Sequence, residues 1–324
     1  MQTEEARTRL RSDLEHYLST LVQDKLYSPN TVAAYRNDLG QFLDHVAESG
    51  AAPEGEWWSL TPARLADYVQ HMKDTKLRNA AGREKPIAMS TVARKIAALK
   101  SFFRYLVEHK QIESDPTQGL DAPKVEKRLP RTLSSEDVEH LLAAPGSSNQ
   151  PKVLRDRALL ELLYATGMRV SELVSLNLDD VNLVTHDVRV RNDRGDKERI
   201  IPVHDRAIEA LQAYLARGRP SLLKNSTDQP ALFLNHRGQK LTRQGMWLII
   251  KEYAERAGIP FEVTPHTLRH SFAAHMLAGH KASLGEVQHF LGHANVSTTQ
   301  IYSQIAADQK PDSAEEVTDS TRLP

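Results

Sequence analysis

The sequence lacks cysteine, long hydrophobic runs and any net charge. The absence of cysteine excludes disulfides, zinc–thiolate sites and cysteine nucleophiles. No apolar run reaches the roughly 18 residues of a membrane-spanning helix, so we expect neither a membrane span nor a membrane partner. The acidic, polar start at 1–5 is unlike a signal peptide. The expected compartment is therefore the cytoplasm, and a length of 324 residues favours two domains over one.

The zero net charge, which sums 42 basic and 42 acidic residues, hides an uneven distribution. Ten Lys or Arg and three Asp or Glu lie between Lys73 and Lys110, a net charge of +7 (10 − 3). Segment 305–324 is acidic and offsets part of this excess. A surface that binds nucleic-acid phosphates and a solvated helix face would both explain the basic stretch.

The first third of the chain has helix starts at Ser28-Pro29, Thr61-Pro62 and Ser90, where a capping residue precedes proline or a helical pattern. With a helical pattern that precedes them at 4–22, these three starts predict four helices, at 4–22, 29–48, 62–73 and 91–108. In the last helix the apolar residues recur at helical spacing, and the basic residues fall largely on other faces. The polar connection between Met72 and Met89 is predicted to be a mobile loop. We expect the basic residues of this region to bind DNA phosphates, namely Lys73, Lys76, Arg78, Arg94, Lys95, Lys100 and Arg104.

A charged, proline-bracketed segment at 119–131 is expected to link a helical domain at 1–118 to a second domain at 132–307, which an acidic tail at 308–324 follows. The second domain opens on a capped helix start at 133–137. Alternating residues at 187–191 and 199–203 predict two strands joined by a turn at 192–198. Helical patterns fill much of the rest, at 155–164, 170–176, 207–217, 243–257, 265–277, 284–290 and 298–305. The predicted fold is mainly helical, with a small antiparallel hairpin.

Two helix starts in the second domain carry residues suited to a phosphate. His266 and Arg269 follow Thr264-Pro265 and project from one face of the first turns, where the helix N-terminus favours an anion. Arg169 follows a glycine turn at another helix start. Two arginines can hold the non-bridging oxygens of a phosphodiester and stabilise the charge that builds up there during a reaction. Taken singly, Arg169 could equally pair with Glu172, and His266 could be a capping or surface histidine.

A zinc site is the rival interpretation of the histidines. His266 and His270 have i, i+4 spacing, but the segment lacks the glutamate of a metalloprotease, and the intervening Arg269 would repel a cation. We therefore expect no metal, although more histidines follow in the sequence, at His275, His280, His289 and His293.

Three segments together carry a resemblance: Ala165-Thr-Gly-Met-Arg-Val-Ser-Glu-Leu, Pro265-His-Thr-Leu-Arg-His-Ser-Phe-Ala, and Leu291-Gly-His with Ser297-Thr-Thr-Gln-Ile-Tyr302. In order and spacing they resemble the tyrosine recombinase/integrase family, in particular its Xer recombinases. The resemblance covers nearly the whole chain up to Tyr302. It implies an N-terminal SAM-like four-helix core-binding domain, and a mixed α+β tyrosine-recombinase catalytic domain with a small antiparallel hairpin or sheet.

The resemblance also implies a reaction. Tyr302 would attack a DNA phosphate, giving a 3′-phosphotyrosyl link and a free 5′-hydroxyl, without a metal or nucleotide cofactor. Arg169, Arg269 and His293 would stabilise the transition state, and His266 would assist proton transfer from the tyrosine. The implied partners are a duplex recombination site and three further protomers in a homo- or heterotetramer. Whether a DNA translocase is a further partner stays open.

The implied function is site-specific recombination through a Holliday junction, in chromosome dimer resolution. An integrase or transposase of a mobile element is the alternative within the same class. A catalytically weakened DNA-binding protein is the alternative from another class.

The hairpin departs from the family pattern, in which Gly-Lys-Gly-x-Lys-Glu-Arg supplies a lysine as general acid. Aligned on Lys197-Glu198-Arg199, the sequence has Arg194 at that lysine's place, and the turn is one residue longer. Arginine, with a pKa above about 12, is a poor proton donor. We predict that Lys197 donates the proton and that Arg194 binds DNA. The alternatives are that water donates it beside Arg194, and that Lys197 is an ordinary exposed turn residue.

Overall fold

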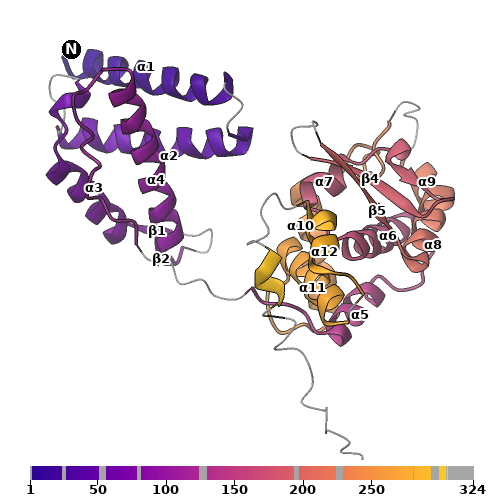
Figure 1. Cartoon of the computed structure of the whole chain (residues 1–324). Coiled ribbons are helices and arrows are strands. Elements are labelled where there is room, and N and C mark those ends of the chain that lie inside the picture. Colours follow the sequence, from indigo (N-terminus) through magenta and orange to yellow (C-terminus); the bar gives the residue numbers. More distant parts are fainter. Residues whose placement is uncertain are drawn as a thin grey trace, which may run out of the picture. The chain divides into compact units, whose positions relative to one another are not determined.

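The computed structural model describes residues 2–23, 27–50, 56–78, 82–123, 130–192, 197–223, 229–279, 281–292, 299–303 and 305. The chain forms two compact units, Met1–Lys127 and Arg128–Pro324, each with its own hydrophobic core (Figure 1). We call them the first and the second unit. Within the described residues, no helix is long and apolar enough to cross a membrane.

The first unit is built from four helices and a short 3-10 turn at Trp57–Ser59. The side chains of Ser28 and Thr61 accept hydrogen bonds from backbone N–H groups of the first turns, and each is followed by proline, so the second and third helices begin where the sequence predicts. The fourth helix begins at Met89 after Ala88, which has no capping side chain, and the predicted start at Ser90 was wrong. Aromatic side chains such as Phe42 and Phe102 fill the core between them. The helices are α1 (Gln2–Gln23), α2 (Pro29–Ser49), α3 (Pro62–Asp74) and α4 (Met89–Glu108).

The connection between α3 and α4, for which the sequence predicts a mobile loop, includes regular secondary structure. It contains two antiparallel strands, β1 (Lys76–Arg78) and β2 (Glu84–Pro86), which pair Lys76 with Pro86 and Arg78 with Glu84. All six residues are exposed. The loop prediction was wrong because strands with no buried face show no alternation of apolar and polar residues.

Helix α6 (Pro151–Thr166) lies at the centre of the second unit. It packs against other helices of the unit and is buried along most of its length. A small antiparallel sheet has the order β3 (Val181–Asn182), β4 (Asp187–Arg191), β5 (Glu198–Pro202). The predicted hairpin is therefore present, with β3 as an additional short strand. The remaining helices are α5 (Ser135–Ala143), α7 (Val170–Ser175), α8 (Asp205–Ala213), α9 (Arg219–Leu223), α10 (Arg243–Arg256), α11 (Pro265–Ala278) and α12 (Leu284–Leu291), with 3-10 and π turns at Leu178–Asp180 and Tyr214–Gly218.

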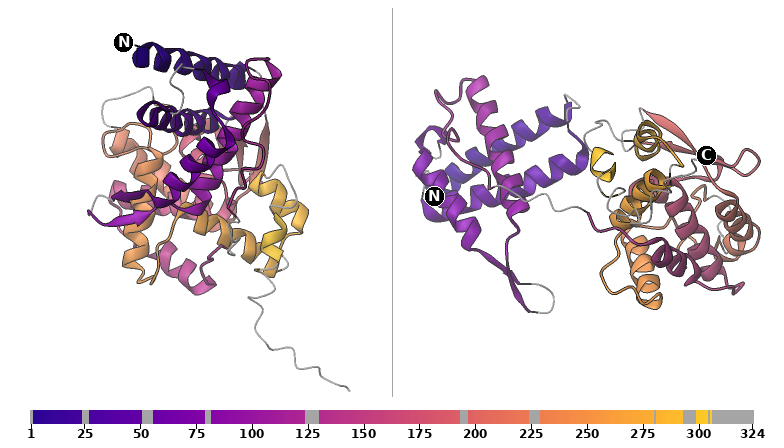
Figure 2. Two further views of the ribbon diagram at one scale, coloured as in Figure 1. Left: turned by 90° about the vertical axis from the view of Figure 1, so that its left-hand side faces the viewer. Right: turned by 60° about the horizontal axis from the view of Figure 1, so that its bottom comes forward.

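The C-terminal part of the second unit brings the motif segments together. Residues 299–303 are helical, and Figure 2 shows this segment in yellow in two views. Tyr302 packs in a small core with residues of α11 and α12, among them Phe272 and Leu291. The single helix predicted at 207–217 is instead α8 followed by the π turn, and the chain continues directly into α9.

Candidate active site

The turn between α6 and α7 requires glycine. Gly167 ends α6 with φ +57°, and a Cβ added to it would lie 2.2 Å from a ring carbon of Phe272 on α11. Only glycine permits both this left-handed backbone and this close approach. The turn places Arg169 at the N-cap of α7, beside the first turns of α11.

Glu172 is a buried carboxylate, with 1% of its side chain exposed, that binds two arginines. Arg199 on β5 donates from Nη1 to Oε1 and from Nη2 to Oε2, each at 2.9 Å. Arg169 donates from Nη1 at 3.1 Å and from its backbone N–H at 2.7 Å. Burial opposes the charged form, but the hydrogen bonds and charges of Arg199 and Arg169 outweigh it and lower the pKa of Glu172. The carboxylate therefore stays ionised and fixes both guanidinium groups.

The sequence left open whether Arg169 pairs with Glu172 or binds a ligand, and the structure allows both. The ion pair is formed, yet 38% of the Arg169 side chain remains exposed. A guanidinium group has five N–H donors, so donors remain for a phosphate.

Arg269 is held by the ends of two helices. It is 4% exposed, and it donates from Nη1 to the carbonyl of Gly167 at 2.7 Å and from Nη2 to that of Leu291 at 2.6 Å. Burial, together with the nearby charge of Arg169, lowers the pKa of Arg269 to about 10. The group is still a cation at neutral pH, and its position is fixed before any ligand arrives.

The C-terminus of α12 gathers three arginines. Besides the bond from Arg269 to Leu291, Arg199 donates from Nε to the carbonyl of Phe290 at 2.8 Å, and Arg169 donates from Nη2 to that of Gly292 at 3.4 Å. The last carbonyls of a helix have no partner within the helix and carry partial negative charge. The end of α12 therefore offsets part of the repulsion among the three cations.

Tyr302 lies in this cluster. It is 3% exposed, and its hydroxyl forms a 2.8 Å hydrogen bond with Nδ1 of His270 on α11. Burial raises the pKa of Tyr302, while the charges of Arg269 and Arg169 act in the opposite direction. The structure thus brings together Arg169, Arg269 and Tyr302, which are far apart in the sequence.

The other predicted catalytic residues are either exposed or outside the described residues. His266 is exposed on the first turn of α11, with its ring centroid 6.3 Å from that of His270. Lys197 is exposed next to β5, and its backbone carbonyl accepts a 2.9 Å hydrogen bond from the N–H of Asn192. His293 and Arg194 lie outside the described residues.

Sequence reasoning missed two members of the cluster, Arg199 and His270. Arg199 served only to align the hairpin, and His270 was considered only as a metal ligand. Both stand directly beside predicted site residues, in Lys197-Glu198-Arg199 and in Arg269-His270, which is the signal that could have found them.

The described residues hold no group of three or more His, Asp or Glu side chains that could bind a metal ion. His280 and His293, which the zinc interpretation also included, lie outside those residues. Over the described part of the chain, the cluster sets three arginines against the single carboxylate of Glu172, and this excess of positive charge suits an anionic ligand.

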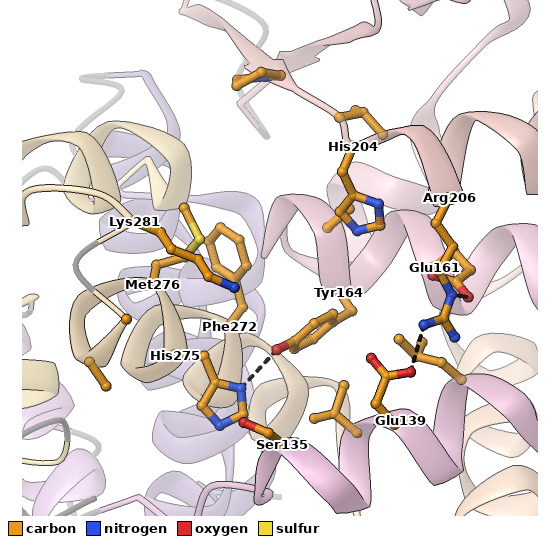
Figure 3. A pocket seen from close by; sticks show the side chains of 17 residues that line it. Ser135, Glu139, Glu161, Tyr164, His204, Arg206, Phe272, His275, Met276 and Lys281 are labelled. Atoms are coloured by element: carbon orange, nitrogen blue, oxygen red, sulfur yellow. Dashed lines mark hydrogen bonds and ion pairs between the residues drawn. The ribbon is translucent and has the colours of Figure 1, made fainter. Parts of the chain in front are cut away.

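A pocket of about 890 Å³ lies in the second unit, and α11 contributes Phe272, His275 and Met276 to its lining (Figure 3). It contains a second tyrosine–histidine pair, in which the Tyr164 hydroxyl and His275 Nδ1 are 2.7 Å apart. At its far side Arg206 donates to Glu139 at 2.6 Å. None of the predicted catalytic residues that the structure describes lines this pocket. The arginine cluster and the pocket are separate features.

Most of the basic residues predicted to bind DNA in the first unit are exposed, but Lys95 is not. Lys95 is 5% exposed, and its ammonium group donates to Gln41 at 2.6 Å and pairs with Asp38 at 3.3 Å. A phosphate contact does not fit this placement, because the charge is buried and already neutralised. Arg94 also pairs with Asp38, and Arg78 pairs with Glu84 at 3.3 Å. The exposed residues are Lys73, Lys76, Arg78, Arg94 and Arg104, and Lys100 is partly buried.

Comparison with known proteins assigns the chain to a family. Residues 131–309 match the phage integrase family, and residues 14–110 match the N-terminal SAM-like domain of phage integrases. "Tyrosine recombinase XerC" of Herpetosiphon aurantiacus is 46% identical over 300 residues, which cover 93% of this chain and 92% of that protein. "Tyrosine recombinase XerD" of Halalkalibacterium halodurans is 40% identical over 303 residues, covering 94% and 96%.

Solved structures show the same fold. A lambda integrase dimer bound to a COC′ core site matches with a TM-score of 0.67 and 19% identity, covering 94% of this chain and 99% of that one. XerH bound to its difH substrate matches with a TM-score of 0.65 and 24% identity, covering 84% and 75%. The chain belongs to the phage integrase family, and it is a tyrosine recombinase of the Xer type. The predicted family and fold class are confirmed.

Proposed function

We propose that this enzyme is a site-specific DNA recombinase that resolves chromosome dimers, with Tyr302 as its nucleophile. The observation that carries the proposal is the position of the Tyr302 hydroxyl, buried against α11 in the electrostatic field of Arg169 and Arg269. The high identity to proteins named XerC and XerD supports the assignment to chromosomal rather than mobile-element recombination.

In the proposed reaction the Tyr302 oxygen attacks phosphorus, forming the 3′-phosphotyrosyl bond, while the bond to the 5′-oxygen breaks. Arg169 and Arg269 bind the two non-bridging oxygens, whose negative charge grows as phosphorus becomes pentacoordinate. Their anchoring to Glu172 and to helix-end carbonyls supports this role, because preorganised cations need no rearrangement during the reaction.

Two protons move in this step. The phenol must lose its proton, and we assign its acceptance to His266, which is exposed at the N-terminus of α11. The leaving 5′-oxygen must gain one, and we assign its donation to Lys197, with Arg194 as an additional DNA contact. We assign His293 to the stabilisation of the phosphorane. The phosphotyrosyl bond conserves the energy of the cleaved phosphodiester bond until a second 5′-hydroxyl attacks, so the proposed reaction needs no metal or nucleotide.

We further propose that a helical domain at 1–118 and a catalytic domain at 132–307, linked by 119–131 and followed by a tail at 308–324, bind the duplex together. Four protomers would assemble on two sites, as in the lambda integrase tetramer solved on a Holliday junction. The enzyme would act in the cytoplasm, where the chromosome lies, with a partner recombinase and a translocase as further candidates for its assembly.

The test is covalent capture. The full chain is incubated with a pool of nicked duplexes whose flanking arms are randomised, and the adducts that survive denaturation are sequenced. Cleavage beside the nick releases a short fragment, so rejoining is prevented and the adduct accumulates. We expect one enriched site with the wild type and no adduct with Tyr302→Phe. An adduct with Tyr302→Phe would overturn the proposal, and DNA binding by the wild type without any adduct would favour a catalytically weakened DNA-binding protein.

A further inference from the structure

Helix α11 carries two histidines that bind tyrosines of other segments through Nδ1. His270 binds Tyr302 at 2.8 Å, and His275 binds Tyr164 at 2.7 Å. The second pair lies in the pocket, outside the arginine cluster (Figure 3). The first pair lies inside it, since Arg269 precedes His270 and its charge acts on Tyr302. The same contact therefore occurs once within the site and once outside it.

We propose that His270 is the positioning residue of the nucleophile: its Nδ1 accepts the hydrogen bond of the Tyr302 hydroxyl and holds that oxygen beside Arg169 and Arg269, ready for the phosphate. This inference rests on the proposed function, in which Tyr302 attacks DNA. It assigns to His270 a task different from that of His266, the proposed proton acceptor one turn earlier on α11.

The charge state of the pair supports this direction of the hydrogen bond. Burial, and the neighbouring His266 and Arg269, lower the pKa of His270 to about 4, so its imidazole is neutral at neutral pH. Burial raises the pKa of Tyr302, so the phenol keeps its proton until the reaction. A neutral imidazole has one acceptor nitrogen, and the phenol has one O–H to donate.

The same charges make His270 a poor final acceptor of the proton. An imidazolium at this position would face the charge of Arg269 and the neighbouring His266, in partly buried surroundings. Before the reaction, His270 therefore holds the O–H and fixes the oxygen. As the bond to phosphorus forms, this hydrogen bond breaks and the proton passes to His266, the proposed acceptor. Positioning of this kind matters because a displacement of about 1 Å in a reacting group can slow a reaction about 100-fold.

The test compares substitutions that keep or remove the Nδ1 acceptor. The side-chain amide of asparagine stands near the place of histidine Nδ1, whereas that of glutamine reaches toward Nε2. Cleavage is measured in single turnover on the nicked duplex recovered by covalent capture, with the full chain in excess. We expect His270→Ala and His270→Gln to slow cleavage about 10- to 100-fold at unchanged DNA affinity. His270→Asn should restore most of the rate, with the pH profile of the wild type.

His275→Ala and His275→Asn are the matched controls, because they remove or mimic the same contact outside the cluster. We expect them to lower the melting temperature but not the cleavage rate. A wild-type rate for His270→Ala would overturn the inference. So would a His270→Asn variant as slow as His270→Ala, since that result would require a titrating base.

A second measurement does not depend on the His270 variants folding well. In the DNA-free wild type, ¹⁵N NMR of labelled histidines should show the His270 Nδ1 as a hydrogen-bonded acceptor, and Tyr302→Phe should shift that nitrogen while leaving His275 unchanged. No shift would contradict the inference. The two proposals fail differently: an inactive wild type refutes the proposed function, whereas an active wild type with an indifferent His270→Ala refutes only the role of His270.

Discussion

The carboxylate of Glu172 is almost fully buried, yet it binds the guanidinium groups of both Arg169 and Arg199. Burying a charge is costly, and removing one partner of a buried ion pair leaves the other uncompensated. Loss of the Glu172 carboxylate would affect Arg199 more than Arg169, since only 9% of the Arg199 side chain is exposed to solvent. Arg169, which we propose binds the phosphate, thus depends on a buried anion for its position.

Glu172→Gln should therefore reduce both stability and cleavage. We expect a loss of about 3 kcal/mol in the free energy of unfolding, as for other broken buried pairs, and a clear fall in the single-turnover rate. Because the folded-state pKa of Glu172 lies below its usual value, its stabilisation is present above the unfolded pKa and is lost as pH falls through the folded pKa. The difference between wild type and variant in denaturant unfolding should thus shrink in acid.

Glu255→Gln is the control for that experiment. Its carboxylate is 70% exposed and lies 3.9 Å from Lys251, so its removal should change stability by less than about 1 kcal/mol. Equal losses in the two variants would contradict the role given to Glu172.

The proton donor on the hairpin can be tested by changing the leaving group. A substrate with sulfur in place of the 5′-bridging oxygen needs no general acid, because a thiolate is a far better leaving group than an alkoxide. We expect Lys197→Ala to slow cleavage of the ordinary substrate and to cleave the sulfur substrate at close to the wild-type rate. If Arg194→Ala shows this rescue and Lys197→Ala does not, the assignment of Lys197 is wrong.

The arrangement of the arginines depends on the C-terminus of helix α12. Gly292 ends α12 with φ +62°, and a Cβ there would lie 2.8 Å from Nη1 and 3.0 Å from Cζ of Arg199. Gly258, after α10, has φ +70° but nothing within 4 Å of the added Cβ. A side chain at either position would be strained by the left-handed backbone, but only at Gly292 would it also collide with Arg199.

Gly292→Ala and Gly258→Ala should therefore behave differently. Both should lose about 1 kcal/mol of stability from the left-handed backbone. Gly292→Ala should in addition displace Arg199 and slow DNA cleavage, whereas Gly258→Ala should cleave at the wild-type rate. Unfolding curves and single-turnover rates measure the two effects, and equal cleavage rates would show that the end of α12 does not organise the site.

Much of the fold follows from local signals in the sequence. Helices α2 and α3 begin where Ser28-Pro29 and Thr61-Pro62 predict, since the capping side chain and the following proline act within a single turn. The strands β1 and β2 could not be predicted, because their residues are all exposed and their pairing joins residues across a loop. The sequence predicts a helix boundary correctly where the residues that set it lie within one turn of it.

In the candidate site, too, some residues follow from local sequence motifs and others only from the tertiary structure. Arg169, Arg269 and Tyr302 were predicted from motif segments, and the structure places them together. The contacts of Arg199 and His270 link residues 91 and 32 positions apart, and no local pattern indicates which side chain faces which across such distances. These positioning contacts require the tertiary structure.

For the whole molecule, the basic residues of the first unit should set the salt dependence of DNA binding. Replacing the exposed Lys73, Lys76 and Arg104 by alanine should reduce the slope of log affinity against log salt by about 0.9 for each phosphate that the variant no longer binds. Lys95→Met should lower stability without changing that slope, because the ammonium is buried against Asp38. Fluorescence anisotropy with a random-sequence duplex measures the slope, and an unchanged slope in the triple variant would place the DNA surface elsewhere.

In the proposed reaction, Tyr302 becomes covalently joined to DNA. The most direct measurement is mass spectrometry of the captured adduct after nuclease and protease digestion, which identifies the residue that carries the nucleotide remnant. We expect a remnant linked through a 3′-phosphate to Tyr302, with Tyr164 unmodified in the same digest. A remnant on any other residue, or a 5′-phosphate linkage, would contradict it.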